Sequence, residues 1–184
     1  MLKTYETDRL YLKILGKEAA PMVLSFYSEN KEHLESWEPE RSKNFYTLAY
    51  HKATLTAEYN QMLEGKRIRF WLFLKDNPDE IIGSVSFQNF LGEPYNSCVI
   101  GYKIGSRHLR QGYAYEAVRK ALYIIFNDCR IHRVEAYIMP ENIPSLRLAE
   151  KLCFNYEGIS YSFAYINSKW RDHMRFSIIN PNDL

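Results

Sequence analysis

The sequence predicts a single domain of the α/β (α+β) class over residues 1–184, a mixed and mostly antiparallel sheet with helices on both faces. Three extended runs follow one another between residues 67 and 104, which is typical of an antiparallel meander. A strongly amphipathic helix then begins near residue 113 and leads into another strand-like run. Strand, helix and strand in this order require a right-handed crossover with parallel pairing.

The first third of the chain predicts a strand followed by helices. Residues 9–15 alternate apolar and polar side chains, the period of a half-buried strand. Residues 17–36 carry a broken helical pattern, with Pro21 suited to a first turn, and predict one or two short helices. Thr47 is a typical N-cap for a longer helix, which Gly65 closes.

Extended runs dominate the middle of the chain. We expect strands at 67–75, 81–91 and 97–104, because turn-forming residues at 76–79 and 92–94 separate them. The helix after them presents one continuous apolar face, formed by Ala114, Ala117, Val118, Ala121, Leu122, Ile125 and Phe126.

The last third predicts a strand at 132–139, a short helix at 141–152, and a hairpin. The hairpin joins extended runs at 154–164 and 169–179 through a turn at Asn167-Ser168. No repeat or linker divides the chain.

The octet 107–114 joins the last meander strand to the amphipathic helix. A helix start leaves about four N–H groups unpaired and carries roughly half a positive charge. Gly112 lets backbone approach a ligand, and Arg107 and Arg110 lie beside it, so the junction is a candidate phosphate cradle. A basic loop that is simply solvated is the alternative.

Composition excludes several classes of function. The 24 basic and 22 acidic residues are spread along the chain and give a net charge of +2, so we expect no direct nucleic-acid binding. Cys98, Cys129 and Cys153 lack the paired spacing of a metal or redox site and indicate buried thiols in a reducing compartment. The polar start of the sequence and the lack of an apolar run of ~18 residues predict a cytoplasmic protein without membrane contact.

Three motifs, together with the order of elements, resemble the Gcn5-related N-acetyltransferase (GNAT) superfamily, and within it the RimJ/RimL branch that acetylates the amino termini of ribosomal proteins. The likeness covers nearly the whole chain and ends at Trp170-Arg171-Asp172-His173 in the last hairpin. Its motifs are Thr7-Asp8-Arg9-Leu10-Tyr11-Leu12, then Ile100-Gly101-Tyr102-Lys103-Ile104 running into the 111–117 segment, and Arg133-Val134-Glu135-Ala136 with the Asn142-Ile143-Pro144-Ser145 segment and Glu150-Lys151-Leu152-Cys153-Phe154.

Two positions depart from the family pattern. Leu109 stands where the family's phosphate loop commonly begins with a basic or amide residue, and Arg107, Arg110 or Gln111 could substitute. Cys153 replaces a glycine, which would cost roughly 1–2 kcal/mol if the backbone is left-handed there.

The resemblance implies a GNAT fold whose central strands splay at a notch for acetyl-CoA, the co-substrate, with no metal. In this arrangement the strand carrying Tyr102 and Ile104 offers backbone groups to the pantetheine. Backbone amides of the loop receive the pyrophosphate, with Arg107 and Arg110 in support, and these amides are those of Gln111, Gly112, Tyr113 and Ala114.

Asn142 and Ser145 each have two interpretations. Asn142 could cap its helix, bind pantetheine, or do both. Ser145 could be an ordinary helix residue, but its family counterpart faces the thiol, so the resemblance assigns it as a possible acid toward the leaving thiolate, directly or through water.

The expected chemistry is direct attack of a neutral amine on the thioester. Neutralising a lysine near pH 7.4 costs about 4 kcal/mol, whereas an α-amine costs under 1 kcal/mol and needs little general base. Glu135 is a candidate base or a sheet brace, and Asp172 with His173 is a second candidate or a turn-stabilising pair. Cys98 and Cys153 are expected to be packing residues.

The acceptor cleft is expected between the early helices and the last hairpin. Its candidate substrate-binding residues are Trp37, Glu38, Tyr161, Tyr165 and Trp170. These residues could equally be core or dimer contacts, because aromatic side chains are enriched in both places. We expect a monomer or a homodimer.

The sequence thus predicts an N-acetyltransferase acting on a protein α-amine, with ribosomal proteins favoured by the resemblance. The alternatives are the same chemistry on a small amine such as a polyamine, amino acid or aminoglycoside, and a non-catalytic acyl-CoA-binding module.

Overall fold

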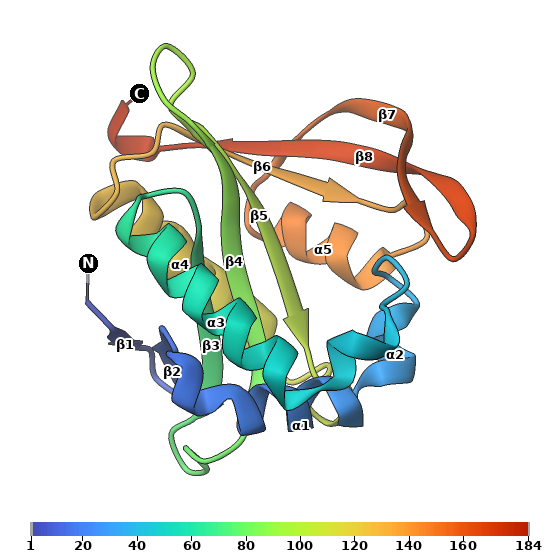
Figure 1. Cartoon of the computed structure of the whole chain (residues 1–184). Helices are drawn as coiled ribbons and strands as arrows, with labels where there is room; N and C mark the ends of the chain where they lie inside the picture. The colour runs from blue at the N-terminus through green and yellow to red at the C-terminus, as the bar shows by residue number, and fades with distance from the viewer. Residues whose placement is uncertain (1, 184) are drawn as a thin grey trace.

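The computed structural model describes residues 2–183. Within them the chain forms one eight-stranded sheet with the strand order β1-β2-β3-β4-β5-β6-β8-β7 (Figure 1). The strands are β1 (Thr4–Glu6), β2 (Leu10–Lys13), β3 (Ile68–Leu74), β4 (Ile81–Leu91), β5 (Ser97–Ile104), β6 (Arg133–Ile138), β7 (Asn155–Ile166) and β8 (Lys169–Ile179).

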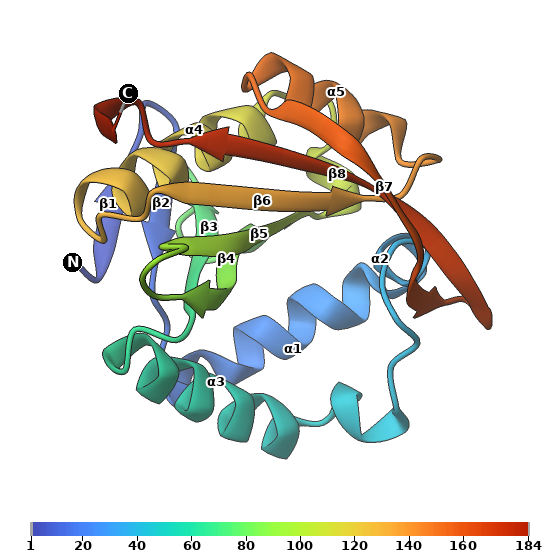
Figure 2. The ribbon, with the colours of Figure 1, turned by 90° about the horizontal axis from the view of Figure 1, so that it is seen from above.

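Helices cover both faces of the sheet, as Figure 2 shows. One face carries α1 (Ala20–Glu29), α2 (Lys31–Glu35) and α3 (Leu48–Leu63), and the other carries α4 (Tyr113–Asn127) and α5 (Ile143–Lys151). No helix within residues 2–183 is both long and apolar enough to cross a membrane.

The sequence-based elements are confirmed, with shifted ends and one addition. The meander β3-β4-β5 is antiparallel. The strands β5 and β6, which precede and follow α4 in the sequence, pair in parallel. Thr47 caps α3 by accepting a hydrogen bond from the Tyr50 N–H, as predicted. The strand β1 is an addition: its three residues are too few to show a period, and pairing with β2 forms it.

The core divides into two clusters, one on each face of the sheet. Because side chains alternate along a strand, Phe70 and Leu72 of β3 pack toward α4, whereas Trp71 and Phe73 pack toward α1 and α3. This alternation also decides which polar side chains reach each face, and it therefore determines the composition of the site.

The sheet opens between β5 and β6. These strands pair over only three positions, from Ser97 opposite Arg133 to Val99 opposite Glu135. Beyond them β5 continues to Ile104 paired only with β4, and β6 continues to Ile138 paired only with β8. The backbone of β5 facing the gap is therefore free to pair with an extended ligand.

The end of α5 explains one departure from the family pattern. Cys153 adopts a left-handed conformation with φ +61°, and its N–H bonds to Glu150 while that of Phe154 bonds to Ala149. These two bonds form a Schellman motif, which usually places glycine at this position. Cys153 therefore carries the steric cost expected from the sequence.

Candidate active site

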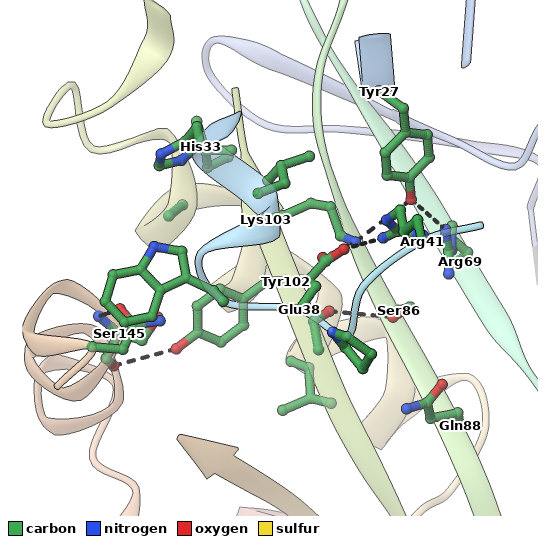
Figure 3. Close-up of a pocket in the computed structure, with 18 of the residues that line it drawn as sticks. Tyr27, His33, Glu38, Arg41, Arg69, Ser86, Gln88, Tyr102, Lys103 and Ser145 are labelled. Atoms are coloured by element: carbon green, nitrogen blue, oxygen red, sulfur yellow. Dashed lines mark hydrogen bonds and ion pairs between the residues drawn. The ribbon is translucent and has the colours of Figure 1, made fainter. Parts of the chain in front are cut away.

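A cavity of about 890 Å³ lies at the gap between β5 and β6 (Figure 3). Its walls include residues of both faces of the sheet: Tyr102, Ser145 and Ala114 on the side of α4 and α5, and Lys103 and Arg69 on the side of α1 and α3. A donor and an acceptor could thus enter this cavity from opposite faces.

The predicted phosphate loop lies at one end of the cavity. Gly112, which directly precedes α4, has a left-handed backbone with φ +83°. Any residue with a side chain would be strained in this conformation, and its Cβ would lie 3.4 Å from Nη2 of Arg9. Arg110 also has a positive φ, of +60°. The loop therefore depends on left-handed backbone just before the helix, and Gly112 satisfies that requirement without strain.

Arg9 of the β2 segment holds this loop in place. Its Nη1 donates to the carbonyl of Gln111 at 3.0 Å, and its guanidinium lies 4.5 Å from the centre of the Tyr113 ring. Its backbone N–H and Nε donate to Glu116 of α4 at 2.8 and 2.7 Å. Strand, loop and helix are thereby fixed together, so the helix start keeps a defined position next to the cavity.

The loop residues proposed from the sequence do not all reach the cavity. Leu109, Arg110 and Ala114 line it, whereas Gln111, Gly112 and Tyr113 do not. The Gln111 amide instead donates to the carbonyl of Arg107 at 3.2 Å. For these three residues, only backbone N–H groups at the helix start remain a candidate contact with phosphate.

The proposal for Arg107 needs correction. Its guanidinium pairs with Glu29 and with Glu80, and it lines a separate cavity of about 300 Å³. Two carboxylates offset its charge, and Arg107 does not line the cavity at the β5–β6 gap.

Tyr102, Asn142 and Ser145 meet at the other side of the gap. The Tyr102 hydroxyl donates to the Ser145 carbonyl at 3.2 Å, and Oδ1 of Asn142 accepts from the Ser145 N–H at 3.3 Å. Asn142 is therefore the N-cap of α5, and it also lines the cavity. Burial raises the pKa of Tyr102 to about 12, so its hydroxyl stays protonated. The Ser145 side chain is thereby placed on the cavity wall beside the gap.

Glu38 forms a charged cluster on the acceptor side. It pairs with both Lys103 and Arg41, and Lys103 also lies 3.5 Å from the Tyr27 hydroxyl (Figure 3). Burial opposes ionisation of Glu38, but Lys103 and Arg41 outweigh it and hold its pKa below the usual value. Glu38 is therefore an anion and a poor proton acceptor.

A second charged cluster lies deeper on the same side. Arg69 and Arg67 both pair with Glu58, at 3.1 and 3.4 Å, and Nη1 of Arg69 donates to the Tyr27 hydroxyl at 3.2 Å. These arginines were not predicted as site residues, because alternating charges on a strand usually indicate a solvated face. Here α1 and α3 cover that face.

Glu135 does not reach the cavity. Its carboxylate accepts hydrogen bonds from Nε of Arg133 and from the Tyr137 hydroxyl, each at 2.8 Å. Burial opposes ionisation, but these bonds outweigh it and lower the pKa of Glu135. The structure therefore does not support Glu135 as the base: this carboxylate lies outside the cavity lining and is held as an anion by two neighbours on its own strand, β6.

The predicted acceptor walls divide into two groups. Trp37 and Glu38 line the cavity. Tyr161, Tyr165 and Trp170 do not: they lie in the β7–β8 hairpin with exposed fractions of 76%, 55% and 63%. Tyr165 and Trp170 pack edge to face on each other instead. The pairing of β7 and β8 is irregular between Ser160 and Ala164, which a strand pattern does not show, and the three side chains are exposed on this hairpin.

His173 of β8 lines the cavity although it is largely buried. It is 6% exposed, lies beside the Phe163 ring at 5.0 Å, and places Nδ1 3.2 Å from the carbonyl of Arg171. A carbonyl accepts only, so Nδ1 carries the proton and Nε2 keeps its lone pair. Burial lowers the pKa of His173, which favours the neutral ring. Asp172 instead accepts from the Ser162 N–H at 2.7 Å and stabilises the hairpin.

The cysteines of the described chain are unsuited to nucleophilic attack. Burial raises the pKa of Cys98 and that of Cys129, so both thiols stay protonated. Neither lines the cavity, and neither does Cys153, which is exposed and so not the buried thiol that the sequence predicts.

Comparisons with known proteins agree with this geometry. The family model described as "Acetyltransferase (GNAT) domain" matches residues 9–155. The chain is 33% identical to the probable N-acetyltransferase YjcK of Bacillus subtilis, covering 95% of this chain and 96% of that protein. It is 31% identical to the [ribosomal protein uS5]-alanine N-acetyltransferase of Escherichia coli, covering 96% and 90%.

Solved structures give the same result. The ribosomal-protein-S5-alanine acetyltransferase of Vibrio fischeri superposes with a TM-score of 0.93 at 27% identity, covering 97% of each chain. RimJ of Mycobacterium smegmatis, in complex with CoA-disulfide, superposes with a TM-score of 0.87 at 25% identity, covering 95% of this chain and 83% of that one. The chain belongs to the GNAT family and is an N-acetyltransferase.

Proposed function

We propose that this enzyme transfers acetyl from acetyl-CoA to the N-terminal α-amine of a ribosomal protein. The observation that carries the proposal is the cavity at the β5–β6 gap, which joins the start of α4 and Ser145 to the face covered by α1 and α3. The relatives named for acetylation of ribosomal protein S5 support the choice of acceptor.

Acetyl-CoA fits the side of α4 and α5. The pyrophosphate would lie at the start of α4, where unpaired N–H groups and the helix dipole favour an anion. Gly112 leaves the backbone accessible there, and Arg110 adds a positive charge. The pantetheine arm would lie in the gap along β5 from Tyr102 to Ile104, whose backbone has no strand partner on that side. The thioester supplies the acetyl group and a thiolate leaving group.

Ser145 and His173 would handle the protons. We propose that Nε2 of His173 accepts the proton that the amine loses on attack, because its lone pair is unused and its ring is neutral. The Ser145 hydroxyl would protonate the leaving thiolate directly or through a water. Since an α-amine costs under 1 kcal/mol to neutralise near pH 7.4, a weak base such as His173 is sufficient.

The test is a comparison of N-terminal acetylation in cells. A strain lacking the gene is compared with the same strain carrying the wild-type gene or His173→Gln, by mass spectrometry of protein amino termini. We expect a ribosomal protein whose N-terminus is acetylated only with the wild-type gene, or far more than with the variant. Identical N-terminal acetylation in all three strains would overturn the proposal.

A further inference from the structure

The acceptor side of the cavity has more positive than negative charge. Glu38 is shared by Arg41 and Lys103, and Glu58 is shared by Arg67 and Arg69, as the ion pairs show. Each carboxylate therefore faces two cations, and each cluster keeps one uncompensated positive charge. The remaining acid on the cavity wall, Glu40, is solvent-exposed.

The deeper cluster also holds unused hydrogen-bond donors. Nε of Arg67 and Nε of Arg69 are buried and have no hydrogen-bond partner within residues 2–183. Buried donors of this kind are rare and costly, and a charged one is more costly still. An acceptor atom brought by a ligand would remove this cost.

The neighbouring groups respond to the same positive potential. Burial, and then the charge of Arg69, lower the pKa of the Arg67 guanidinium. Burial opposes ionisation of Tyr27, but Lys103 and Arg69 outweigh it and lower the pKa of its hydroxyl. The Tyr27 direction is the one expected beside an excess of cations, whereas burial is the first cause of the Arg67 shift. Burial opposes ionisation of Arg69, but Tyr27 and Glu58 outweigh it and raise its pKa. The excess of positive charge therefore follows from the ion pairs.

The distance from Arg69 to the β5–β6 gap determines which residue of a bound acceptor polypeptide would carry the anion. Arg69 is opposite Ser86, which is opposite Gly101 of β5, so one row crosses the three strands toward the gap. Two strand spacings make about 10 Å, which is the span of about three extended residues. Ser86 and Gln88 line the cavity between the two ends and leave this path polar.

We propose that Arg67, Arg69 and the Glu38–Arg41–Lys103 cluster form a carboxylate-binding subsite, and that the enzyme prefers polypeptide N-termini with Asp or Glu at positions two to four. The inference rests on the proposed function and adds a substrate class to it. The carboxylate would lie against the accessible edges of the Arg67 and Arg69 guanidinium groups, whose side chains are 27% and 13% exposed, while the α-amine reaches toward His173 on the cavity wall. A carboxylate matches these donors better than an amide does, because a guanidinium binds both oxygens of an anion.

The experiment compares pairs of peptides that differ only in a side-chain carboxylate or carboxamide. Peptides with Glu at position two, three or four are each matched with a Gln peptide, and kcat/KM is measured from thiol release with acetyl-CoA. For the best position we expect the wild-type enzyme to prefer Glu about tenfold or more, the usual effect of one charge-assisted hydrogen bond. Arg67→Gln should reduce the preference to about twofold or less, and Arg67→Lys should restore part of it.

Control variants distinguish a failure of the carboxylate-binding subsite from a failure of the proposed function. Arg119→Gln removes an exposed arginine of α4 outside the cavity and should keep the full preference. The KM for acetyl-CoA and the melting temperature should be similar for Arg67→Gln and wild type. Equal rates for every Glu and Gln pair would overturn the inference and leave the proposed function intact. Faster acetylation of free glutamate than of any peptide would assign the subsite to a metabolite instead, and no acetylation of any peptide would overturn both.

Discussion

The carboxylate of Glu116 in α4 accepts hydrogen bonds from both the backbone N–H and the Nε of Arg9, 107 residues earlier in the chain. It also accepts from the Thr7 hydroxyl at 2.5 Å. Through Arg9, which bonds to Gln111 and lies over Tyr113, this one carboxylate links the edge of the sheet to the loop before α4. The loop is therefore positioned by contacts outside the cavity as well as by its own conformation.

Glu116→Gln should destabilise the protein by about 1–2 kcal/mol, because it removes the charge from these hydrogen bonds and leaves one amide group facing donors. Burial opposes ionisation of Glu116, but the bonds from Thr7 and Arg9 outweigh it and hold its pKa below the usual value. Because its pKa is lower in the folded state, Glu116 stabilises the folded protein at pH values above its unfolded-state pKa, near 4.3. This stabilisation is lost as the pH falls through the folded-state pKa.

Thermal melts at pH 7 and pH 3 measure this effect. The wild-type advantage over Glu116→Gln should be full at pH 7 and should shrink below about pH 4. An advantage that is equal at both pH values would show that the charge of Glu116 does not contribute.

Gly112→Ala should weaken binding of CoA about tenfold or more and lower stability by about 1–2 kcal/mol. The reason is the positive φ of Gly112, together with the contact between an added Cβ and Arg9. Calorimetric titration with CoA measures the affinity. Gly65→Ala is a matched control, because Gly65 also has a positive φ but lies at the end of α3; it should lose stability and keep CoA affinity.

Cys153→Gly should stabilise the protein by about 1 kcal/mol. Glycine adopts the left-handed conformation of this position without the steric cost that cysteine has. Chemical denaturation measures the change, and the acetylation rate should stay the same because Cys153 does not line the cavity. A loss of stability would mean that the thiol makes a favourable contact that outweighs the strain.

His173→Gln should reduce kcat by about a hundredfold and leave the KM for acetyl-CoA close to the wild-type value. Burial lowers the pKa of His173, so its protonation should reduce the wild-type rate only below about pH 6.5. Above that pH, the ionisation of the acceptor amine should govern the profile in both proteins. A variant with unchanged kcat across this range would exclude His173 as the proton acceptor.

The parts of the fold and site that depend on local sequence were predictable. Gly112 before an amphipathic helix and Asn142 three residues before Ser145 are local patterns with a local physical cause, and both occupy the predicted places. Tyr102 and Ile104 lie on the predicted strand beside the gap, because turn-forming residues at 92–94 set off an extended run there.

The remainder depends on contacts between distant segments. Arg67 and Arg69 alternate with apolar residues as in a solvent-facing strand, and only the position of α1 and α3 buries them. Arg107 has the charge expected of a phosphate ligand, but Glu29 and Glu80 pair with it from 78 and 27 positions away. Tyr161, Tyr165 and Trp170 have the expected composition of a cleft wall, but they are exposed on the β7–β8 hairpin and do not line the cavity.

Acetylation of a protein terminus can be assayed by incubating the purified enzyme with acetyl-CoA and ribosomal protein S5 of the same organism, and then locating the acetyl group by tandem mass spectrometry. We expect acetylation of the N-terminal α-amine, with unmodified lysines and with little product from His173→Gln. Acetyl groups confined to lysine side chains, or turnover of polyamines and free amino acids without any modification of the protein terminus, would contradict this expectation.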